Sequence, residues 1–312
     1  MRLYTFEVAG RRHIGAELNR QLVDLTAAHA ARLAAQGRRE GEPENIAPDM
    51  LTFLRAGEPA MNAARAALQF AGDQAAKLEG KGVFSAFDKV KLCAPVPRPG
   101  KILASGINYR GHLEEEPGAT LPEEPFFFSK LPSCVVGPGD AIIHPKDTDQ
   151  VDYEVELAVV FGRAARRVPE SEILNYVAGY TIHHDVSARR VQMKDHQITL
   201  GKNYDTFAPM GPCLVTADEI PDPTTSHLTL KTSVNGQVMQ DSSTADWVFP
   251  LPVLLAALNR VMTIEAGDVV STGCPAGVGL FRHPQVFLKP GDVTRLEIEK
   301  IGVLENHVVM EE

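Results

Sequence analysis

Two acidic residues stand two positions apart in the segment Asp152-Tyr153-Glu154-Val155-Glu156, and an apolar run follows them to Val160. Residues two apart in a β-strand point to the same face, so Glu154 and Glu156 would lie side by side. On a buried strand, two neighbouring carboxylates repel each other and are costly to desolvate. A divalent cation bound between them would relieve both penalties. The alternative is that the pair forms an acidic patch where the strand emerges into solvent.

The segment 179–189 has the pattern of a strand that runs into a turn, and it carries His183, His184 and Asp185 in succession. Alternation along a strand places His183 and Asp185 on one face and His184 on the other. Asp185 could supply a third carboxylate ligand, which would complete a hard oxygen site suited to Mg²⁺, Mn²⁺ or Ca²⁺. A rival arrangement takes His183 or His184 into an iron site of two histidines and one carboxylate. In the simplest alternative, both histidines are packed or solvated and bind nothing.

His112 and Glu115 are three residues apart in the segment 106–115, which follows a short apolar run. On one helical turn these two side chains would face the same way. The carboxylate could then orient the imidazole and raise its basicity, which would make His112 a general base for activating water. An exposed pair on a surface helix has the same spacing.

Two lysines adjoin apolar sequence: Lys130 follows Phe128-Ser129, and Lys202 follows Leu200-Gly201. Near an acidic metal site, a partly buried lysine could bind a substrate carboxylate or stabilise an oxyanion. A surface lysine whose alkyl stem covers apolar neighbours would show the same pattern. The glycine-rich turn 273–279 lacks both the G-x-G-x-x-G spacing and the P-loop lysine, so it does not predict a nucleotide site.

These residues need a scaffold, and the sequence after residue 100 predicts one that is rich in strands. Short β-branched or apolar runs bounded by glycine, proline or aspartate are typical of a mainly antiparallel β architecture. Such runs cover 101–105, 125–129, 155–161, 177–183, 213–216, 228–234, 269–272 and 293–298. Gly-Asp pairs at 139–140, 267–268 and 291–292 each predict a tight turn that starts a strand. Helices are few here, and 249–261 is the clearest.

The first 95 residues have a different character. Residues 3–8 alternate and lead into a hairpin-like turn, and alanine-rich helices are expected over 27–36 and 58–78. Three prolines in the stretch 95–99 cannot continue a helix or a central strand. We therefore predict a small α/β domain over 1–95 and a larger domain over 96–312 that holds the candidate site. The expected fold class is α+β, mainly β.

Length, charge and cysteine usage narrow the function classes. The chain has 312 residues, and its net charge of −9 argues against a nucleic-acid or anionic-membrane surface. No apolar run approaches the length needed to span a bilayer, and the N-terminus does not read as a secretory signal. The four cysteines form no C-x-x-C pair and suit a reducing compartment, so we expect a cytoplasmic protein.

Six motifs together resemble those of the fumarylacetoacetate hydrolase superfamily, and they occur in its order. They are Gly106-x-Asn108-Tyr109-x-x-His112, Tyr153-Glu154-x-Glu156-Leu157, Asp185-x-Ser187-Ala188-Arg189, Met210-Gly211-Pro212, Val234-Asn235-Gly236 and Gly273-x-Pro275-x-Gly277-Val278-Gly279. Any one motif is weak, but six in order are specific, and the resemblance covers about residues 90–308. It implies a mixed β-roll catalytic domain, a smaller N-terminal domain of the kind that many bacterial members carry, and a homodimer.

The resemblance also implies roles for individual residues. It implies that Mg²⁺ or Mn²⁺ is held by Glu154, Glu156 and Asp185, that His112 and Glu115 activate water, that Lys202 is the active-site lysine, and that substrate contacts come from Lys130, Arg189, Gln192 and Cys274. Cys274 stands where the family usually has threonine. Because a thiol is larger and a poorer hydrogen-bond donor than a hydroxyl, the expected substrate contact changes at this position.

We therefore predict a metal-dependent hydrolase that cleaves a C–C bond in a 2,4-dioxo acid of the acylpyruvate or fumarylpyruvate type and releases an enolate. The main alternative is decarboxylation of an oxaloacetate-type 2-oxo acid. Ureidoglycolate-lyase-like cleavage and dioxo-acid isomerisation are further alternatives. Two other classes remain: a non-catalytic metal-binding or carboxylate-sensing module, and an oxygen-using iron enzyme built on His183. The expected partner is a small oxo-acid substrate, with no nucleic acid and no membrane.

Overall fold

The computed structural model of the chain describes residues 1–38, 46–115, 118 and 120–312. Its strands are β1 (Arg2–Val8), β2 (Arg11–Leu18), β3 (Gln21–Asp24), β4 (Phe84–Ser85), β5 (Lys91–Cys93), β6 (Ile102–Ser105), β7 (Phe127–Lys130), β8 (Val135–Val136), β9 (Ala141–His144), β10 (Val151–Asp152), β11 (Val155–Phe161), β12 (Val177–His184), β13 (Ser187–Ala188), β14 (Ala208–Thr216), β15 (Thr229–Val234), β16 (Gln237–Ser243), β17 (Val269–Ser271), β18 (Val293–Ile298) and β19 (Gly302–Met310). Its α-helices are α1 (Leu25–Ala35), α2 (Met50–Arg55), α3 (Glu58–Asp73), α4 (Ala75–Leu78), α5 (Arg110–Glu115), α6 (Arg189–Met193), α7 (Ile198–Lys202), α8 (Pro223–Ser226) and α9 (Leu251–Val261).

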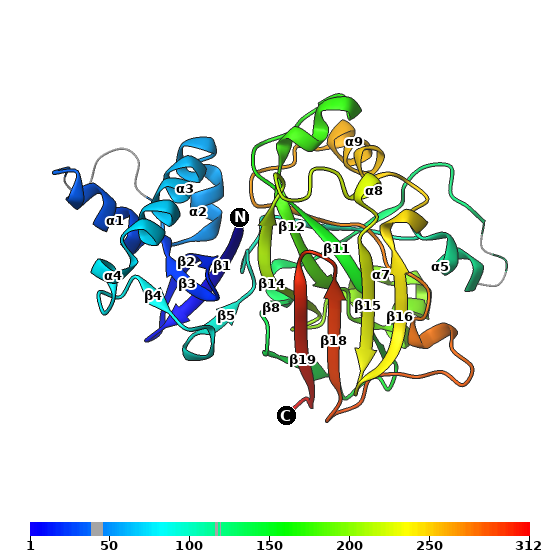
Figure 1. Ribbon diagram of the computed structural model, residues 1–312. Coiled ribbons are helices and arrows are strands. Elements are labelled where there is room, and N and C mark those ends of the chain that lie inside the picture. The colour runs from blue at the N-terminus through cyan, green and yellow to red at the C-terminus, as the bar shows by residue number, and fades with distance from the viewer. Residues whose placement is uncertain (39–45, 116–117, 119) are drawn as a thin grey trace.

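Two large sheets form the body of the molecule (Figure 1). Over the described residues, the larger sheet has 12 strands in the order β4-β3-β2-β1-β14-β12-β11-β17-β6-β7, with β5 paired to β1 and β8 paired to β14. The smaller sheet has five strands in the order β16-β15-β18-β19-β9. Most neighbouring strands are antiparallel, whereas β17 with β6, β14 with β8 and β19 with β9 run parallel. This mixed α/β fold, mostly of strands, confirms the predicted class.

The apolar core connects the two sheets. Leu157 of β11, Leu230 of β15, Leu296 of β18 and Leu304 of β19 belong to one buried cluster. β11 is buried along its whole length, whereas β18 alternates exposed and buried residues. A strand covered on both faces needs a continuous apolar run, and a strand with one wet face needs alternation. The sequence of each strand therefore matches its place in the fold.

The three predicted Gly-Asp turns all start strands. Gly139, Gly267 and Gly291 have φ angles of 77°, 85° and 96°, in the left-handed region that favours glycine. β9, β17 and β18 begin two residues after these glycines. In each turn the aspartate accepts a hydrogen bond from the backbone N–H three residues before it. The aspartate thus stabilises the turn that its glycine permits.

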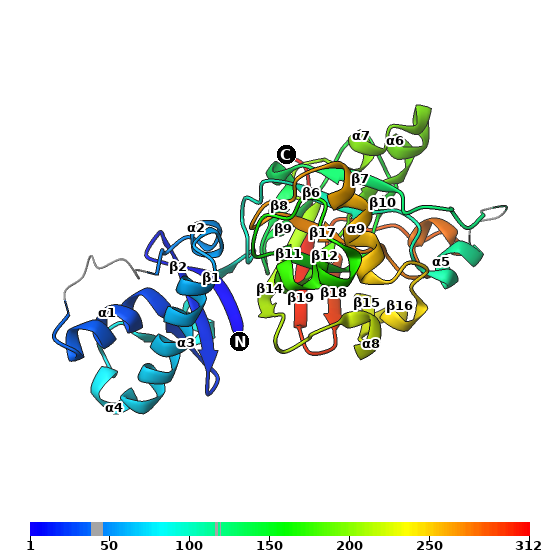
Figure 2. The same ribbon diagram turned by 90° about the horizontal axis from the view of Figure 1, so that it is seen from above.

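The N-terminal elements extend the larger sheet. β1 pairs with β14, where Leu3 lies opposite Leu214. Helices α1, α2 and α3 share a buried cluster with β1, β2 and β3, and Figures 1 and 2 show these elements gathered at one end of the molecule. α1 begins after Asp24, whose side chain accepts a hydrogen bond from the backbone N–H of Ala27 as an N-cap. A domain boundary near residue 95 stays a prediction.

The predicted helices are present with modest changes. The helix expected over 27–36 is α1, and the one expected over 249–261 is α9. The long helix expected over 58–78 is divided into α3 and α4 at Gln74. In the described part of the chain, no helix has both the length and the apolar character that crossing a membrane requires.

Candidate active site

Glu154 and Glu156 meet at the start of β11. Glu154 directly precedes the strand and Glu156 is its second residue, and both side chains are buried. Cys274 joins them from the turn after β17. One ligand atom from each of these three residues lies within 4.8 Å of the others. Two carboxylates and a thiol therefore converge on one point.

Asp185 follows β12 and lies beside Glu154, because its backbone N–H donates to the Glu154 carbonyl oxygen at 3.0 Å. Lys202, at the end of α7, places Nζ 2.7 Å from Oε2 of Glu154 and 2.7 Å from Oδ2 of Asp185. Lys130, at the end of β7, donates to Oδ1 of Asp185 and to the Val186 carbonyl oxygen. Two ammonium groups therefore hold the Asp185 carboxylate.

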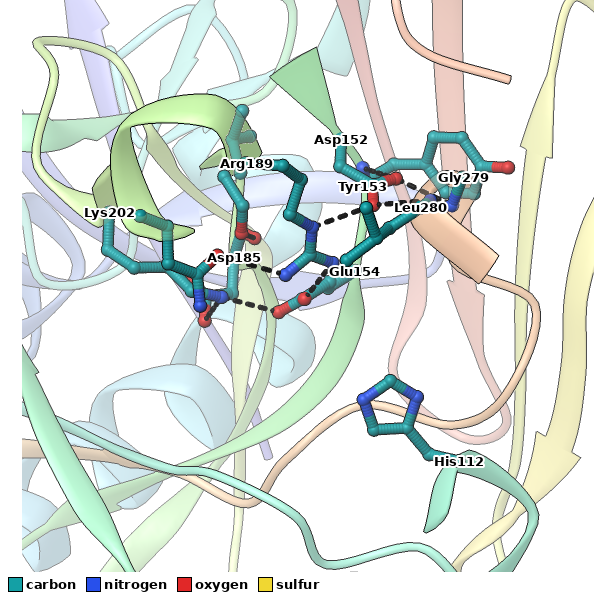
Figure 3. A network of polar contacts seen from close by, with 12 residues as sticks. His112, Asp152, Tyr153, Glu154, Asp185, Arg189, Lys202, Gly279 and Leu280 are labelled. Atoms are coloured by element: carbon teal, nitrogen blue, oxygen red, sulfur yellow. Dashed lines mark hydrogen bonds and ion pairs between the residues drawn. The ribbon is translucent and has the colours of Figure 1, made fainter. Parts of the chain in front are cut away.

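Asp152 is a buried member of this network that the sequence motifs did not indicate (Figure 3). It accepts hydrogen bonds from Nε of Arg189 at 2.8 Å and from the backbone N–H groups of Gly279 and Leu280 at 2.7 and 3.0 Å. Arg189 also donates to Glu154 through Nη2. Arg189 therefore connects Glu154 to Asp152, and Asp152 connects both to the turn that begins at Gly279.

Glu156 differs from Glu154 and Asp185, because over the described residues no lysine or arginine bonds to it. Its Oε2 accepts from the Ser271 hydroxyl and from the Gly273 backbone N–H at 3.1 Å. Both hydrogen bonds reach the same oxygen. In the described structure, Oε1 of Glu156 therefore has no protein donor.

Neighbouring charges shift the pKa values of Glu156 and Asp185 in opposite directions. Burial, with the neighbouring Asp185 and Glu154, raises the pKa of Glu156 well above its usual range. Burial would raise the pKa of Asp185 as well, but Lys130 and Lys202 outweigh it and hold that pKa far below its usual range. Asp185 is thus an ion that the protein has already paired, whereas the more distant charge of Lys202 offsets the effect of burial on Glu156 only in part.

His183 and His184 lie outside the cavity wall that the carboxylates line. Both are fully buried at the end of β12, and burial lowers the pKa of each to about 3, which keeps both rings neutral. Over the described residues, neither lines the cavity or joins the group of potential metal ligands. The geometry gives no support to an iron site of two histidines and one carboxylate.

A cavity of about 270 Å³ opens in front of these groups. The predicted site residues that line it are His112, Glu154, Glu156, Arg189, Gln192, Lys202 and Cys274. Phe126, Phe128 and Phe281, which the motifs did not indicate, add apolar wall. Lys130 is 1% exposed and is not part of the lining, so the geometry does not place it in contact with substrate. Its partner Asp185 also lies behind the lining.

His112 reaches the cavity from α5, apart from the ionic network (Figure 3). Its Nδ1 lies 3.3 Å from Oε2 of Glu115, and Oε1 of Glu115 accepts from the backbone N–H of Gly277 at 2.8 Å. The His112 ring packs at a tilt against Phe281, with 5.7 Å between ring centroids. Glu115 therefore orients the imidazole and fastens its helical turn to the glycine-rich segment.

The donor set fits a divalent cation. Carboxylate oxygens are the ligands that Mg²⁺ and Mn²⁺ prefer, and Glu156 offers an oxygen that no donor in the described part of the chain occupies. Cys274 adds a thiol whose pKa is raised well above its usual range by burial and by Glu154 and Glu156. Burial and repulsion from neighbouring acidic groups raise the pKa values of both Glu156 and Cys274. A cation bound among these groups would offset that repulsion.

Comparison with known proteins shows to which family the chain belongs. The family model described as "Fumarylacetoacetate (FAA) hydrolase C-terminal" matches residues 101–309. A curated relative, "Oxaloacetate tautomerase Fahd2a, mitochondrial" of Rattus norvegicus, is 44% identical over 261 residues, which are 83% of this chain and 79% of that protein.

Solved structures give the same result over the whole chain. The fumarylacetoacetate hydrolase EaFAH from psychrophilic Exiguobacterium antarcticum is 33% identical with a TM-score of 0.79, and the match covers 100% of both chains. The maleylpyruvate hydrolase from Sphingobium sp. SYK-6, determined in complex with manganese(II) and pyruvate, is 29% identical with a TM-score of 0.75 and the same coverage. With the matching family model and these relatives, the chain belongs to the fumarylacetoacetate hydrolase family of enzymes.

Proposed function

We propose that the protein interconverts the keto and enol forms of oxaloacetate, or of a 2-oxo diacid of similar size, with the help of a divalent cation. One observation carries the proposal: a single small cavity brings together paired buried carboxylates, the Lys202 ammonium and the His112 imidazole. The choice of substrate is supported by the relative from Rattus norvegicus, which is named an oxaloacetate tautomerase.

The cation would be held by Glu154 and Glu156, and Asp185 would join them once one of its oxygens is released by Lys130 or Lys202. Keto–enol exchange moves one proton between carbon 3 and the oxygen on carbon 2 of oxaloacetate, and negative charge develops on that oxygen. A bound divalent cation would supply Lewis acidity to the substrate, which would make the proton on carbon 3 more acidic.

The chain's own residues would move the proton and steady the charge. His112, oriented by Glu115, would take the proton from carbon 3 and deliver it to the oxygen on carbon 2, and it would carry the proton back in the reverse reaction. Lys202 would donate a hydrogen bond to the oxygen on carbon 2 as its charge grows. Arg189 keeps Glu154 in place from behind, and Gln192 in the cavity wall would face the distal carboxylate.

The size of the cavity favours a compact substrate. Ligand cavities in proteins commonly run from about 300 to 1,000 Å³, and this one is about 270 Å³. A four-carbon diacid suits that space better than a long or aromatic dioxo acid.

Hydrolytic C–C cleavage of a 2,4-dioxo acid is the second candidate. The His112–Glu115 pair could activate water, and the structural likeness to a maleylpyruvate hydrolase with bound manganese and pyruvate favours this chemistry. Decarboxylation of oxaloacetate would use the same stabilisation of enolate charge without water. All three reactions share the site and differ in the bond that breaks.

Three assays on the metal-free protein, with Mg²⁺ or Mn²⁺ added back, distinguish these reactions. We expect a fast change in the ultraviolet absorbance of the oxaloacetate enol, little pyruvate from oxaloacetate or acetylpyruvate, and loss of the rate in a chelator. Pyruvate from oxaloacetate would favour decarboxylation, and pyruvate from acetylpyruvate would favour hydrolysis. No acceleration in any assay would contradict the proposal.

Light scattering of the same sample tests the homodimer that the resemblance implies.

A further inference from the structure

Three buried side chains line up across three neighbouring strands of the larger sheet. β11 lies between β12 and β17. His183 of β12 is directly opposite Glu156 of β11, and Ser271 of β17 is opposite Ala158, two residues along β11 from Glu156. Residues two apart share a face of a strand. His183, Glu156 and Ser271 therefore lie on the same face of the sheet.

The three side chains form a continuous hydrogen-bond chain. Nδ1 of His183 lies 2.7 Å from Oγ of Ser271, and the Ser271 hydroxyl donates to Oε2 of Glu156. All three residues are at most 1% exposed. Water therefore has little access to compete for these hydrogen bonds.

The direction of each hydrogen bond follows from the chemistry of the groups. As a ligand of the cation, Glu156 is an ionised carboxylate that only accepts, so the Ser271 proton points to its Oε2. Ser271 Oγ must then accept from His183, which requires the proton of the neutral imidazole to sit on Nδ1. A hydroxyl that accepts one hydrogen bond donates a stronger one. His183 therefore strengthens the contact by which Ser271 holds Glu156.

We propose that Ser271 and His183 are positioning residues, which fix one carboxylate oxygen of Glu156 so that the other is presented to the divalent cation. The inference rests on the proposed function only in taking Glu156 as a metal ligand. The Gly273 backbone N–H, 3.1 Å from the same Oε2, is the second fixed donor. With Oε2 occupied by two donors, Oε1 is the oxygen left for the cation.

Four variants of the full-length protein test this inference by calorimetric titration of the metal-free protein with Mn²⁺. Ser271→Ala and His183→Leu break the chain, and we expect each to weaken Mn²⁺ binding by roughly tenfold or more, as loss of a contact behind a metal ligand commonly does. His183→Asn places an amide N–H close to the position of Nδ1, and we expect it to restore affinity to within about threefold of the unchanged protein.

Thr181→Val is the matched control. Thr181 is a buried residue of the same strand β12, and its hydroxyl donates to the Gly211 carbonyl oxygen at 3.2 Å rather than to the site. This variant also removes one buried hydroxyl, and we expect unchanged Mn²⁺ affinity. Thermal unfolding of each metal-free variant shows which ones are folded. If Ser271→Ala does not fold, the contrast between His183→Asn and His183→Leu decides.

The outcomes separate this inference from the proposed function. Unchanged Mn²⁺ affinity in folded Ser271→Ala or His183→Leu would overturn the positioning role, whatever the substrate. Equal weakening in His183→Asn and His183→Leu would also overturn it, because packing alone would then explain the effect. If the unchanged protein binds Mn²⁺ but does not act on oxaloacetate, the proposed substrate fails while the affinity series still tests the positioning role. If it does not bind Mn²⁺ at all, both fail.

Discussion

Glu154 and Asp185 share one ammonium group, with Nζ of Lys202 2.7 Å from a carboxylate oxygen of each. All three side chains are buried. Burial lowers the pKa of Lys202, but Asp185 and Glu154 outweigh that effect and raise it above its usual value. The ammonium group is therefore charged at neutral pH, and it keeps two metal-ligand candidates close together before any cation binds.

Replacing Lys202 tests this arrangement. Lys202→Ala leaves two buried carboxylates without that partner, and breaking a buried ion pair costs about 3–5 kcal/mol. We therefore expect a lower unfolding temperature and a large loss of turnover. Added Mn²⁺ should raise the unfolding temperature of this variant more than that of the unchanged protein, because the cation replaces the lost charge. Lys231→Ala, at a half-buried position of β15 far from the site in sequence, is the control. If Mn²⁺ raises the unfolding temperature of Lys202→Ala and of the unchanged protein equally, the shared-ammonium interpretation is contradicted.

Asp152→Asn tests the network behind the cavity. Asp152 pairs with Arg189 and caps the turn that begins at Gly279. The amide keeps the shape but loses the charge, so we expect urea unfolding to show destabilisation of about 3 kcal/mol. We also expect lower turnover, because Arg189, which binds Glu154, loses its charged partner. Asp241→Asn, an exposed residue of β16, should change neither. Unchanged stability of Asp152→Asn would show that the network is not needed.

The thiol of Cys274 predicts that the site has a measurable affinity for Zn²⁺ as well as for Mn²⁺. Thiolate ligands favour Zn²⁺, whereas carboxylates suit Mg²⁺ and Mn²⁺. We expect Cys274→Thr to weaken Zn²⁺ binding much more than Mn²⁺ binding, measured by competition with a metal indicator. Cys93→Ser, a buried thiol outside the cavity, controls for the loss of a cysteine. Equal changes for both metals would mean that the thiol is not a ligand.

Replacing His112 tests its assignment as the general base. Loss of a general base commonly lowers rates by about 10²–10⁴, so we expect His112→Ala to lose turnover by that order while Mn²⁺ affinity stays the same. Glu115→Gln should show a smaller loss, because Glu115 orients the ring and anchors its helical turn but does not itself move the proton. His307→Ala, an exposed residue of β19, should keep full activity. A fully active His112→Ala would end the assignment.

Local sequence patterns predicted the scaffold where neighbouring residues decide the structure. β11 begins and ends at Val155 and Phe161 as predicted, because its seven consecutive buried residues are all apolar except Glu156. β19 was not predicted, because Glu305, Asn306 and His307 interrupt its apolar pattern. Its pairing with β18 on one side and β9 on the other fixes this segment as a strand, and such pairing is not visible in a local window.

The candidate site was predictable only where its residues are close in sequence or match a family motif. The period of a strand brings Glu154 and Glu156 together. Asp152 was not indicated, because its partner Gly279 is 127 residues away. The only local signal for Asp152 is its position two residues before Glu154. The contact between His183 and Ser271 spans 88 residues and depends on the order of three strands, which no local pattern encodes.

The most direct test of the whole account is the rate of oxaloacetate tautomerisation by metal-free protein before and after addition of Mg²⁺ or Mn²⁺, compared with Glu156→Gln. The control is Glu297→Gln, an exposed residue of β18. We predict that adding the cation raises the tautomerisation rate of the unchanged protein and of the control. We predict that Glu156→Gln is folded but that its rate stays low after the cation is added. Full activity in excess chelator, or an unimpaired Glu156→Gln enzyme, would contradict a carboxylate-held cation at the centre of the chemistry.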